Sequence, residues 1–208
     1  MQTYFYEPSK GQGFPRSPFK AIVAPRPIGW MSTISSEGQV NLAPYSFFNA
    51  FCEAPPIVAF GSAGAKDSVR NAREIGEFVV NLATITLAEK MNLTSLNLPH
   101  GESEMDLAGL DAAASTLVRA LRVASTPAAL ECKVTSILHL QDHAGRKVDS
   151  FLVLGEVVGV HIDPAFLKDG LFDTAAARPI ARCGYRGDYA EVRSLFEMIR
   201  PALLPAAR

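Results

Sequence analysis

Cysteine is scarce in this chain of 208 residues, and its three cysteines, Cys52, Cys132 and Cys183, lie far apart. An odd number of thiols without a CxxC pair argues against a disulfide framework and against a cysteine-based metal site. The simplest interpretation is a reduced protein of the cytoplasm. Cys183 is the best candidate for a reactive thiol, because it stands in the polar segment Arg182-Cys183-Gly184.

Several other features are missing, and each absence excludes a class of protein. No apolar run reaches the ~18 residues of a membrane-spanning helix, and the first residues lack the basic and apolar regions of a signal peptide. A net charge of −1 argues against a nucleic-acid binder. The four histidines show no metal-ligand spacing with cysteines or carboxylates, so no metal site is predicted.

What the chain does contain is apolar residues, at 48% of the total, which is enough for a sizeable core. Short segments rich in β-branched and aromatic residues and bounded by turn residues are typical of strands. Such segments are residues 28–35, 40–51, 57–60, 77–84, 129–140 and 150–162, and the last two are expected to form a hairpin.

Helices are expected between several of these strands. The first covers residues 69–75, begins at an N-cap of Asp67 or Ser68, and ends at Gly76. Further helices are expected at 87–96, at 112–122, within 163–177 near Pro164, and from 188 to 201, whereas 99–107 is polar and expected to be exposed.

Many strands with inserted helices, and no regular βαβ alternation, favour a mainly β fold with peripheral helices. The expected architecture is a closed, mostly antiparallel barrel. We expect one domain over residues 18–190, preceded by an N-terminal arm of residues 1–17 and followed by a C-terminal helical tail of residues 191–208.

Short polar side chains lie along the first two expected strands and are followed by the cation of Lys66, a combination that suits the binding of a flat, phosphorylated heterocycle. Lys66 and Ser68, with Ser62 just upstream, are the candidates for the phosphate, since amides at a helix start together with an ammonium attract anions. A solvated lysine and ordinary loop or capping serines are the structural alternative. Asp67 is better suited to cap the helix, although its backbone amide could also contribute.

The other polar candidates also have two interpretations. Arg26, whose backbone is restricted by a proline on each side, could hold a phosphate or ring carbonyls, or it could form a surface ion pair. Ser32, Thr33 and Ser46 could bind hydroxyls or phosphate of the ligand, or they could bond to nearby backbone. Asn41 could donate to the ring edge, but asparagine is also favoured after a hairpin turn.

Three aromatic residues, Trp30, Tyr45 and Phe47, could stack on such a ring, although aromatic residues on strands more often belong to the core. His161, near the end of its expected strand, could also lie at the site. A lone histidine at such a position is more often structural.

Several segments together carry a resemblance to a known family: Arg26-Pro27-Ile28, Ser32-Thr33, the run from Asn41 to Phe48, Pro55-Pro56, Lys66-Asp67-Ser68, Asn71 and the run from Phe78 to Leu82. Weaker similarity continues to Tyr189. In these segments the chain resembles the flavin reductase-like family, which has the FMN-binding split-barrel fold.

The resemblance implies a homodimer that binds FMN near the subunit interface, with the backbone amide of Ala43 facing the flavin ring. It also implies a flavin reductase-like oxidoreductase that moves a hydride from NADH or NADPH to the flavin, which does the redox chemistry itself. The reduced flavin could serve a monooxygenase or another electron acceptor. The alternatives are a non-enzymatic FMN-binding electron carrier and, less favoured, a split barrel that binds another ligand such as haem.

Overall fold

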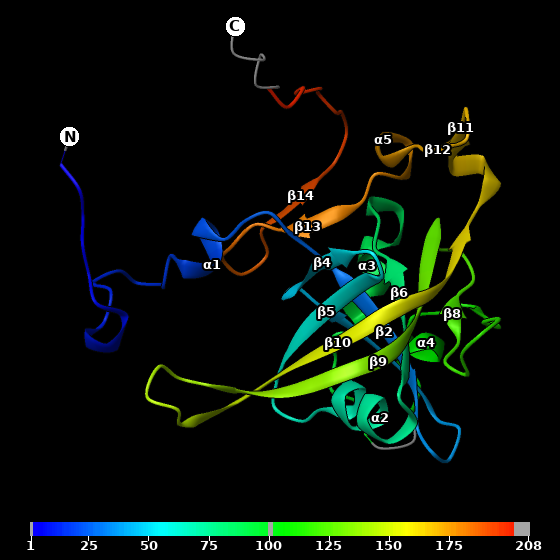
Figure 1. Ribbon diagram of the computed structural model, residues 1–208, viewed down its shortest axis with the longest axis horizontal. Helices are drawn as coiled ribbons and strands as arrows, with labels where there is room; N and C mark the ends of the chain where they lie inside the picture. The colour runs from blue at the N-terminus through cyan, green and yellow to red at the C-terminus, as the bar shows by residue number, and fades with distance from the viewer. Residues whose placement is uncertain (1, 100–101, 202–208) are drawn as a thin grey trace, which may run out of the picture.

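The computed structural model describes residues 2–99 and 102–201, and its centre is one antiparallel sheet of seven strands (Figure 1). The strands of this sheet are β2 (Gly29–Ile34), β3 (Val40–Tyr45), β4 (Phe48–Glu53), β5 (Pro56–Ala63), β6 (Glu77–Leu82), β9 (Ala128–Gln141) and β10 (Lys147–Ile162). Their spatial order is β3-β2-β6-β9-β10-β5-β4. The mainly β fold expected from the sequence is therefore confirmed, and β9 and β10 form the expected hairpin.

The sheet curls strongly but does not close. Strands β3 and β4 follow each other in the sequence, with only Ser46 and Phe47 between them, yet they form its two opposite edges. The two edges must therefore approach each other at this connection, where the amide of Gly61 donates to the Phe47 carbonyl at 2.7 Å. Among the described residues no ladder pairs β3 with β4, so the barrel is split. This confirms the split barrel that the family resemblance implied and corrects the closed barrel expected from the strand pattern alone.

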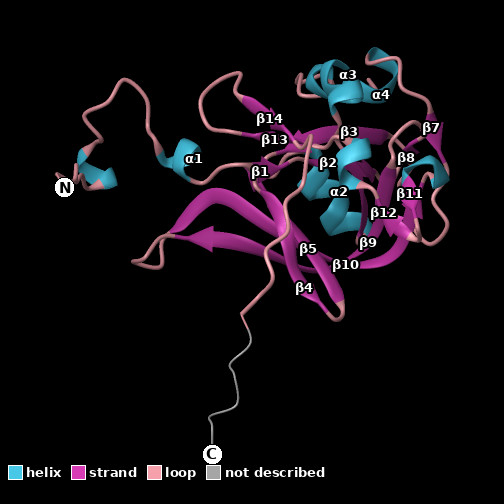
Figure 2. Ribbon diagram, turned by 90° about the horizontal axis from the view of Figure 1, so that it is seen from above, coloured by secondary structure: helices cyan, strands magenta, loops and turns pink. Residues whose placement is uncertain are grey.

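Strand β2 is buried on both faces, because helices cover it from both sides (Figure 2). Helix α2 (Asp67–Ile75) lies on one side, and helices α3 (Ala88–Leu93) and α4 (Glu104–Leu107) lie on the other. Side chains alternate along a strand, so Met31 packs with Phe78 and Val69 on the α2 side, whereas Trp30 packs with Met91 on the other. Both Trp30 and Met31 are fully buried.

The remaining elements are short and lie around this sheet. The small strands are β1 (Arg26–Pro27), β13 (Ile180–Arg182), β14 (Tyr189–Glu191), β7 (Ala112–Ala113), β8 (Arg122–Val123), β11 (Leu167–Lys168) and β12 (Leu171–Phe172). The short helices are α1 (Phe19–Ile22), α5 (Thr174–Ala177) and the 3-10 turns η1 (Pro8–Lys10), η2 (Ile85–Leu87) and η3 (Pro164–Phe166). Within the described residues, the segments before α1 and after β14 extend away from the sheet (Figure 1).

Two helix predictions are confirmed, and Gly76 ends α2 with φ of 75° and its amide on the Ala72 carbonyl. The N-cap, however, is Lys66 rather than Asp67 or Ser68, and it makes no side-chain cap. Residues 99–107 are not uniformly exposed, since Glu104 is buried in α4. Within that segment, residues 100–101 lie outside the described residues.

Two other helix predictions were wrong, and a third is confirmed only in short pieces. Residues 112–122 form no helix, because the amides that a helix would use are taken by a buried carboxylate described below. Residues 163–177 contain the 3-10 turn η3, which begins at Pro164, and the short helix α5, but a turn at Asp169 and Gly170, both with positive φ, separates the two. Residues 192–201 form no helix: their apolar side chains, such as Phe196 at 85% exposure, find no surface to pack on, and packing supplies most helical stability in proteins. Residues 202–208 of the expected tail lie outside the described residues.

None of the described helices has the length and apolar character needed to cross a membrane.

Candidate functional site

Strands β2 and β3 place four of the sequence candidates on the face that α2 covers. The register pairs Thr33 with Asn41 and Met31 with Ala43, and Tyr45 follows two residues further along β3. Residues two apart on a strand share a face, so Asn41, Ala43 and Tyr45 form one row beside Thr33. The alternation of the sequence thus creates a row of small and polar groups next to the start of α2.

Side-chain hydrogen bonds hold this row in a fixed arrangement. The Asn41 amide donates to Thr33 Oγ1 at 3.1 Å and to Ser68 Oγ at 2.9 Å. Asn71, one turn further along α2, donates to the same Thr33 oxygen at 3.1 Å. Thr33, Ser68 and Asn71 are all buried. Asn71 belongs to the family resemblance but was not among the candidate site residues. A polar residue on the buried face of α2, next to the exposed Arg70, was the feature that could have indicated a role at the site.

Tyr45 and Ser62 complete the inner part of this row. Burial raises the pKa of the Tyr45 hydroxyl above its ordinary value, although interactions with the side chains of Ser68 and Ser62 act in the opposite direction. The Ser62 hydroxyl also donates to the Gly64 carbonyl at 3.0 Å. Tyr45 is therefore a neutral hydrogen-bonding group at neutral pH, and it packs its ring on Phe60 with centroids 4.9 Å apart.

The start of α2 adds positive charge to this face. The amides of Val69 and Arg70 both donate to the Lys66 carbonyl, whereas within the described chain those of Asp67 and Ser68 have no backbone partner. Asp67 does not cap the helix, since its carboxylate pairs with Arg70 one turn later. Lys66 is exposed and belongs to no ion pair among the described residues, so its ammonium is free to meet an anion there.

A cavity of about 430 Å³ opens over these groups. Among the sequence candidates it is lined by Asn41, Ala43, Tyr45, Lys66, Asp67 and Ser68. It is also lined by residues that were not candidates: Pro44, Arg70, Thr94, Ser95, Leu96, Asn97, Leu98 and Glu104. The volume falls within the range of typical small-molecule sites. A neighbouring cavity of about 230 Å³ shares five lining residues with it, so the hollow continues along the edge of β3; they are Asn41, Asp67, Arg70, Leu98 and Glu104.

Glu104 is the functional-site residue that sequence reasoning missed most clearly, because it was assigned to an exposed segment. Its carboxylate is buried and accepts the amide of Leu42 on β3 at 3.1 Å. It fixes α4 against β3 and brings a negative charge to the wall of the cavity. Its sequence neighbourhood is polar, so no apolar period indicated that α4 packs inward.

Three of the sequence candidates lie elsewhere. Ser32 points to the opposite face of β2 from Thr33, is fully buried, and donates to the Leu121 carbonyl. Arg26 and Ser46 line a different cavity, at the other side of the connection between β3 and β4. Of the aromatic candidates, Trp30 is a core residue whose indole donates to Thr94 Oγ1 at 2.9 Å, and Phe47 is half exposed outside the cavity.

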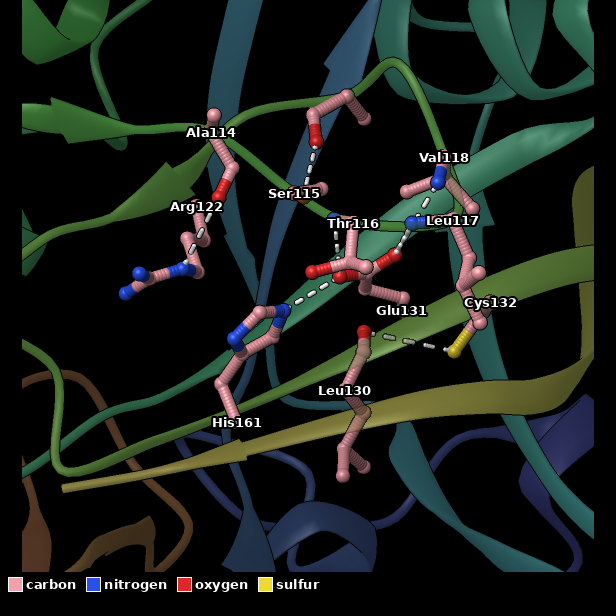
Figure 3. Close-up of polar contacts among 11 residues, drawn as sticks. Ala114, Ser115, Thr116, Leu117, Val118, Arg122, Leu130, Glu131, Cys132 and His161 are labelled. Atoms are coloured by element: carbon pink, nitrogen blue, oxygen red, sulfur yellow. Dashed lines mark hydrogen bonds and ion pairs between the residues drawn. The ribbon is translucent and has the colours of Figure 1, made fainter. Parts of the chain in front are cut away.

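His161 does not lie at this cavity but contacts Glu131, a fully buried carboxylate on β9 (Figure 3). Glu131 also accepts the amides of Thr116 at 2.7 Å and Val118 at 3.1 Å, and that of Leu117 between them. This carboxylate holds the loop between β7 and β8 on the sheet, so the role of His161 here is structural.

The neighbouring thiol of Cys132 is equally unsuited to chemistry, because burial raises its pKa far above the ordinary value. Cys183 is half-buried and Cys52 is exposed, and all three cysteines are free. Within residues 2–99 and 102–201, no three His, Cys, Asp or Glu side chains come together as a metal site.

The Glu131 cluster predicts an acid-sensitive fold. Burial is the largest influence on the Glu131 pKa and raises it, but the bonds from Thr116, His161 and Leu117 together bring the pKa below its ordinary 4.5. A carboxyl with a lowered folded pKa stabilises the fold above its unfolded pKa, and the contribution is lost as the pH falls through the folded value. We expect the free energy of unfolding, measured with urea between pH 7 and pH 3, to fall below about pH 5. A Glu131→Gln variant should lack part of this decline; an identical decline in both proteins would assign it to other carboxylates.

A family model and a sequence relative both match most of this chain. The family model described as flavin reductase like domain matches residues 23–180. An uncharacterized protein of Halalkalibacterium halodurans is 35% identical over 186 residues, which cover 87% of this chain and 88% of the relative.

Solved structures share the fold over nearly the whole chain. Nitrilotriacetate monooxygenase component B from Bacillus cereus superposes with a TM-score of 0.85 at 28% identity, over 95% of this chain and 100% of that one. The 2-nitrobenzoate 2-nitroreductase NbaA from Pseudomonas fluorescens gives a TM-score of 0.78 at 29% identity, with 91% of each chain covered. The split-barrel architecture is therefore shared with both.

Proposed function

Because the chain belongs to the flavin reductase-like family, we propose that it binds FMN and moves a hydride from NADH or NADPH to the flavin. The observation that carries this proposal is the cavity between β3 and the start of α2, where a row of hydroxyl and amide groups meets a free ammonium. The structures of nitrilotriacetate monooxygenase component B and of a nitroreductase support a redox role, because both names describe oxidoreductase systems.

The residues present fit the chemistry of FMN. Its phosphate carries close to two negative charges and requires charge-assisted donors, which Lys66 and the free amides at the start of α2 supply. The hydroxyl of Ser68, fixed by Asn41, is a further donor. Glu104 repels an anion on its own side of the cavity, so the phosphate is expected at the Lys66 side and the uncharged parts of the ligand along β3.

Bound flavin would supply the hydride acceptor in this reaction. The chain itself needs no strong acid or base, because hydride transfer depends on close and aligned contact between two rings. What β3 contributes is position: Ala43 presents a backbone and Tyr45 a neutral hydroxyl at a wall fixed by the hydrogen bonds of Asn41. No single substitution is therefore expected to abolish the chemical step while leaving FMN bound.

An absorbance spectrum followed by addition of NADH and NADPH tests the function directly. We expect the purified protein, or the protein mixed with FMN, to show bound flavin, and we expect it to oxidise NADH or NADPH in a flavin-dependent manner. Tight stoichiometric flavin without nicotinamide oxidation would instead support the electron carrier. A protein that does not bind FMN in titration would contradict both.

We also propose that the protein is a homodimer. Strand β4 is an edge of the sheet, and its Phe51 is 62% exposed. Ile22, Val23, Phe47 and Phe51 line a mostly apolar cavity of about 480 Å³ between α1 and this edge. Exposed apolar patches of this kind on an edge strand mark interaction surfaces, and a second copy is the occupant that the family resemblance implies.

The dimer proposal predicts that Phe51→Glu weakens association at least tenfold, since the new carboxylate would have to be desolvated in the interface. Light scattering after size exclusion should give the wild type twice the mass of the 22.4-kDa chain. Leu171 on β12 is 73% exposed, so Leu171→Glu is the matched control and should remain dimeric. A wild type that is monomeric at tens of micromolar protein would contradict the proposal.

A monooxygenase or another acceptor remains the proposed partner for the reduced flavin. Location in the cytoplasm stays a sequence prediction, to be checked by fractionation.

A further inference from the structure

A second cavity, of about 370 Å³, lies on the other side of the connection between β3 and β4. It is lined by Ser17, Phe19, Lys20, Arg26, Ser46, Arg182, Gly184, Tyr185 and Arg186. Four of these side chains are cationic, and no carboxylate lines the cavity. None of the four cations belongs to an ion pair among the described residues. A concave surface with one sign of charge concentrates ligands of the opposite sign.

Arg26 is the best-defined member of this set because it is buried, with 6% of its surface exposed. Its Nη1 donates to the carbonyls of Lys20 and Val23, while its Nε is a buried atom without any partner in the described structure. The guanidinium also lies 5.9 Å from the centre of the Phe47 ring. Carbonyls and a ring offset this charge only in part, and a buried charge without a counter-ion is unfavourable.

Arg182 adds a second charge directly opposite the first. Strands β1 and β13 are antiparallel, and their register pairs Arg26 with Arg182. Directly opposed residues of an antiparallel pair point to the same face, and like charges there destabilise the pairing. The Arg182 guanidinium lies 4.5 Å from the centre of the Tyr189 ring, which orients it without neutralising it. An anion between the two arginines would screen their repulsion and supply the missing counter-charge.

We propose that this cavity binds the phosphate groups of a second ligand, separate from the FMN phosphate at Lys66. Ser46 lines this cavity, whereas Tyr45, its neighbour in the sequence, lines the flavin cavity. A ring bound along β3 would therefore lie next to the cation cavity. In this respect the inference rests on the proposed function, since the phosphate-bearing ligand that must approach a flavin is the nicotinamide dinucleotide.

The test measures the binding of inorganic pyrophosphate by calorimetry, with and without saturating FMN. The variant is Arg182→Gln/Arg186→Gln, because Arg186 is exposed and Arg182 only half-buried, so neither is needed for the core. Arg146→Gln, on the turn between β9 and β10, is the matched control, since its side chain is 80% exposed and lines neither cavity. We expect the double variant to bind pyrophosphate at least tenfold more weakly than the wild type and the control, with or without FMN.

Two further arms identify the source of the phosphate. NADH and NADPH should bind more weakly to the double variant by a similar factor if the dinucleotide is the ligand; an effect on pyrophosphate alone would support a different phosphorylated ligand at the same site. Equal pyrophosphate affinity in all three proteins would overturn the inference. So would a selective loss of FMN over riboflavin affinity in the double variant, because the cavity would then be the FMN phosphate site.

This design separates the two proposals. Pyrophosphate binding that depends on Arg182 and Arg186 can be observed in protein that binds no flavin, in which case the proposed function fails and the anion site stands.

Discussion

Lys66→Ala is expected to raise the dissociation constant for FMN by about 10- to 150-fold, which corresponds to roughly 1.5–3 kcal/mol. The reason is the loss of a charge-assisted hydrogen bond to the phosphate. The carboxylate of Asp67 already pairs with Arg70, so no other cation at the start of α2 can replace Lys66 as a phosphate ligand. Calorimetric titration of the variant with FMN measures the effect.

Riboflavin provides the sharpest control for Lys66, because it has the same ring and ribityl chain but no phosphate. The substitution should leave riboflavin affinity unchanged within about twofold, since the ammonium contributes only to the charged group. Lys147→Ala, at an exposed position on β10, is the matched variant and should bind FMN like the wild type. Unchanged FMN affinity in Lys66→Ala, or an equal loss for both ligands, would remove Lys66 from the phosphate site.

The second large effect is expected for Glu131→Gln, which should lower the free energy of unfolding by about 2–4 kcal/mol at neutral pH. Both carboxylate oxygens are used: one accepts Thr116 and His161, and the other accepts Leu117 and Val118. Glutamine keeps one acceptor oxygen, but its NH₂ replaces the other oxygen and faces backbone amides that are themselves donors. Buried donors are then left unpaired, and each costs about 1–3 kcal/mol.

Urea denaturation followed by circular dichroism measures this loss, with the slope checking that the same surface is exposed. Glu77→Gln is the matched control, because Glu77 accepts a single backbone amide of the same loop, that of Arg119 at 2.9 Å, besides an ion pair with the exposed Arg119 side chain at 3.7 Å. Its loss should be about 1 kcal/mol or less. Equal losses in the two variants would show that the number of bonds at Glu131 does not determine its contribution.

Much of the fold could be predicted from local patterns. Strand-forming residues on both sides of the turn at 36–39 indicated the β2–β3 hairpin, although the single strand expected over 40–51 is divided into β3 and β4, and Gly76 indicated the end of α2. The alternation of side chains along the observed strand explains why Asn41, Ala43 and Tyr45 share the cavity. It also shows why Ser32 could not join Thr33, since neighbouring residues on a strand face opposite sides.

Other parts of the site depend on long-range contacts that no local pattern encodes. Arg26 was a candidate for the same phosphate as Lys66, but its strand pairs with β13, more than 150 residues later, and so faces another cavity. Glu104 lies in a polar segment and is buried through its bond to the Leu42 amide and through the packing of the neighbouring Met105 in the core. The helix expected at 112–122 was lost for a similar reason, because Glu131 takes up its amides.

The strand order also constrains the sequence of folding events. The β2–β3 and β4–β5 hairpins are local and precede the other strands of this sheet in the sequence, yet they form its opposite ends. The three strands that join them, β6, β9 and β10, come from residues 77–162. Non-local pairing of this kind slows folding. During synthesis, β2 and β5 therefore lack their inner pairing partners until β6 and β10 have been made.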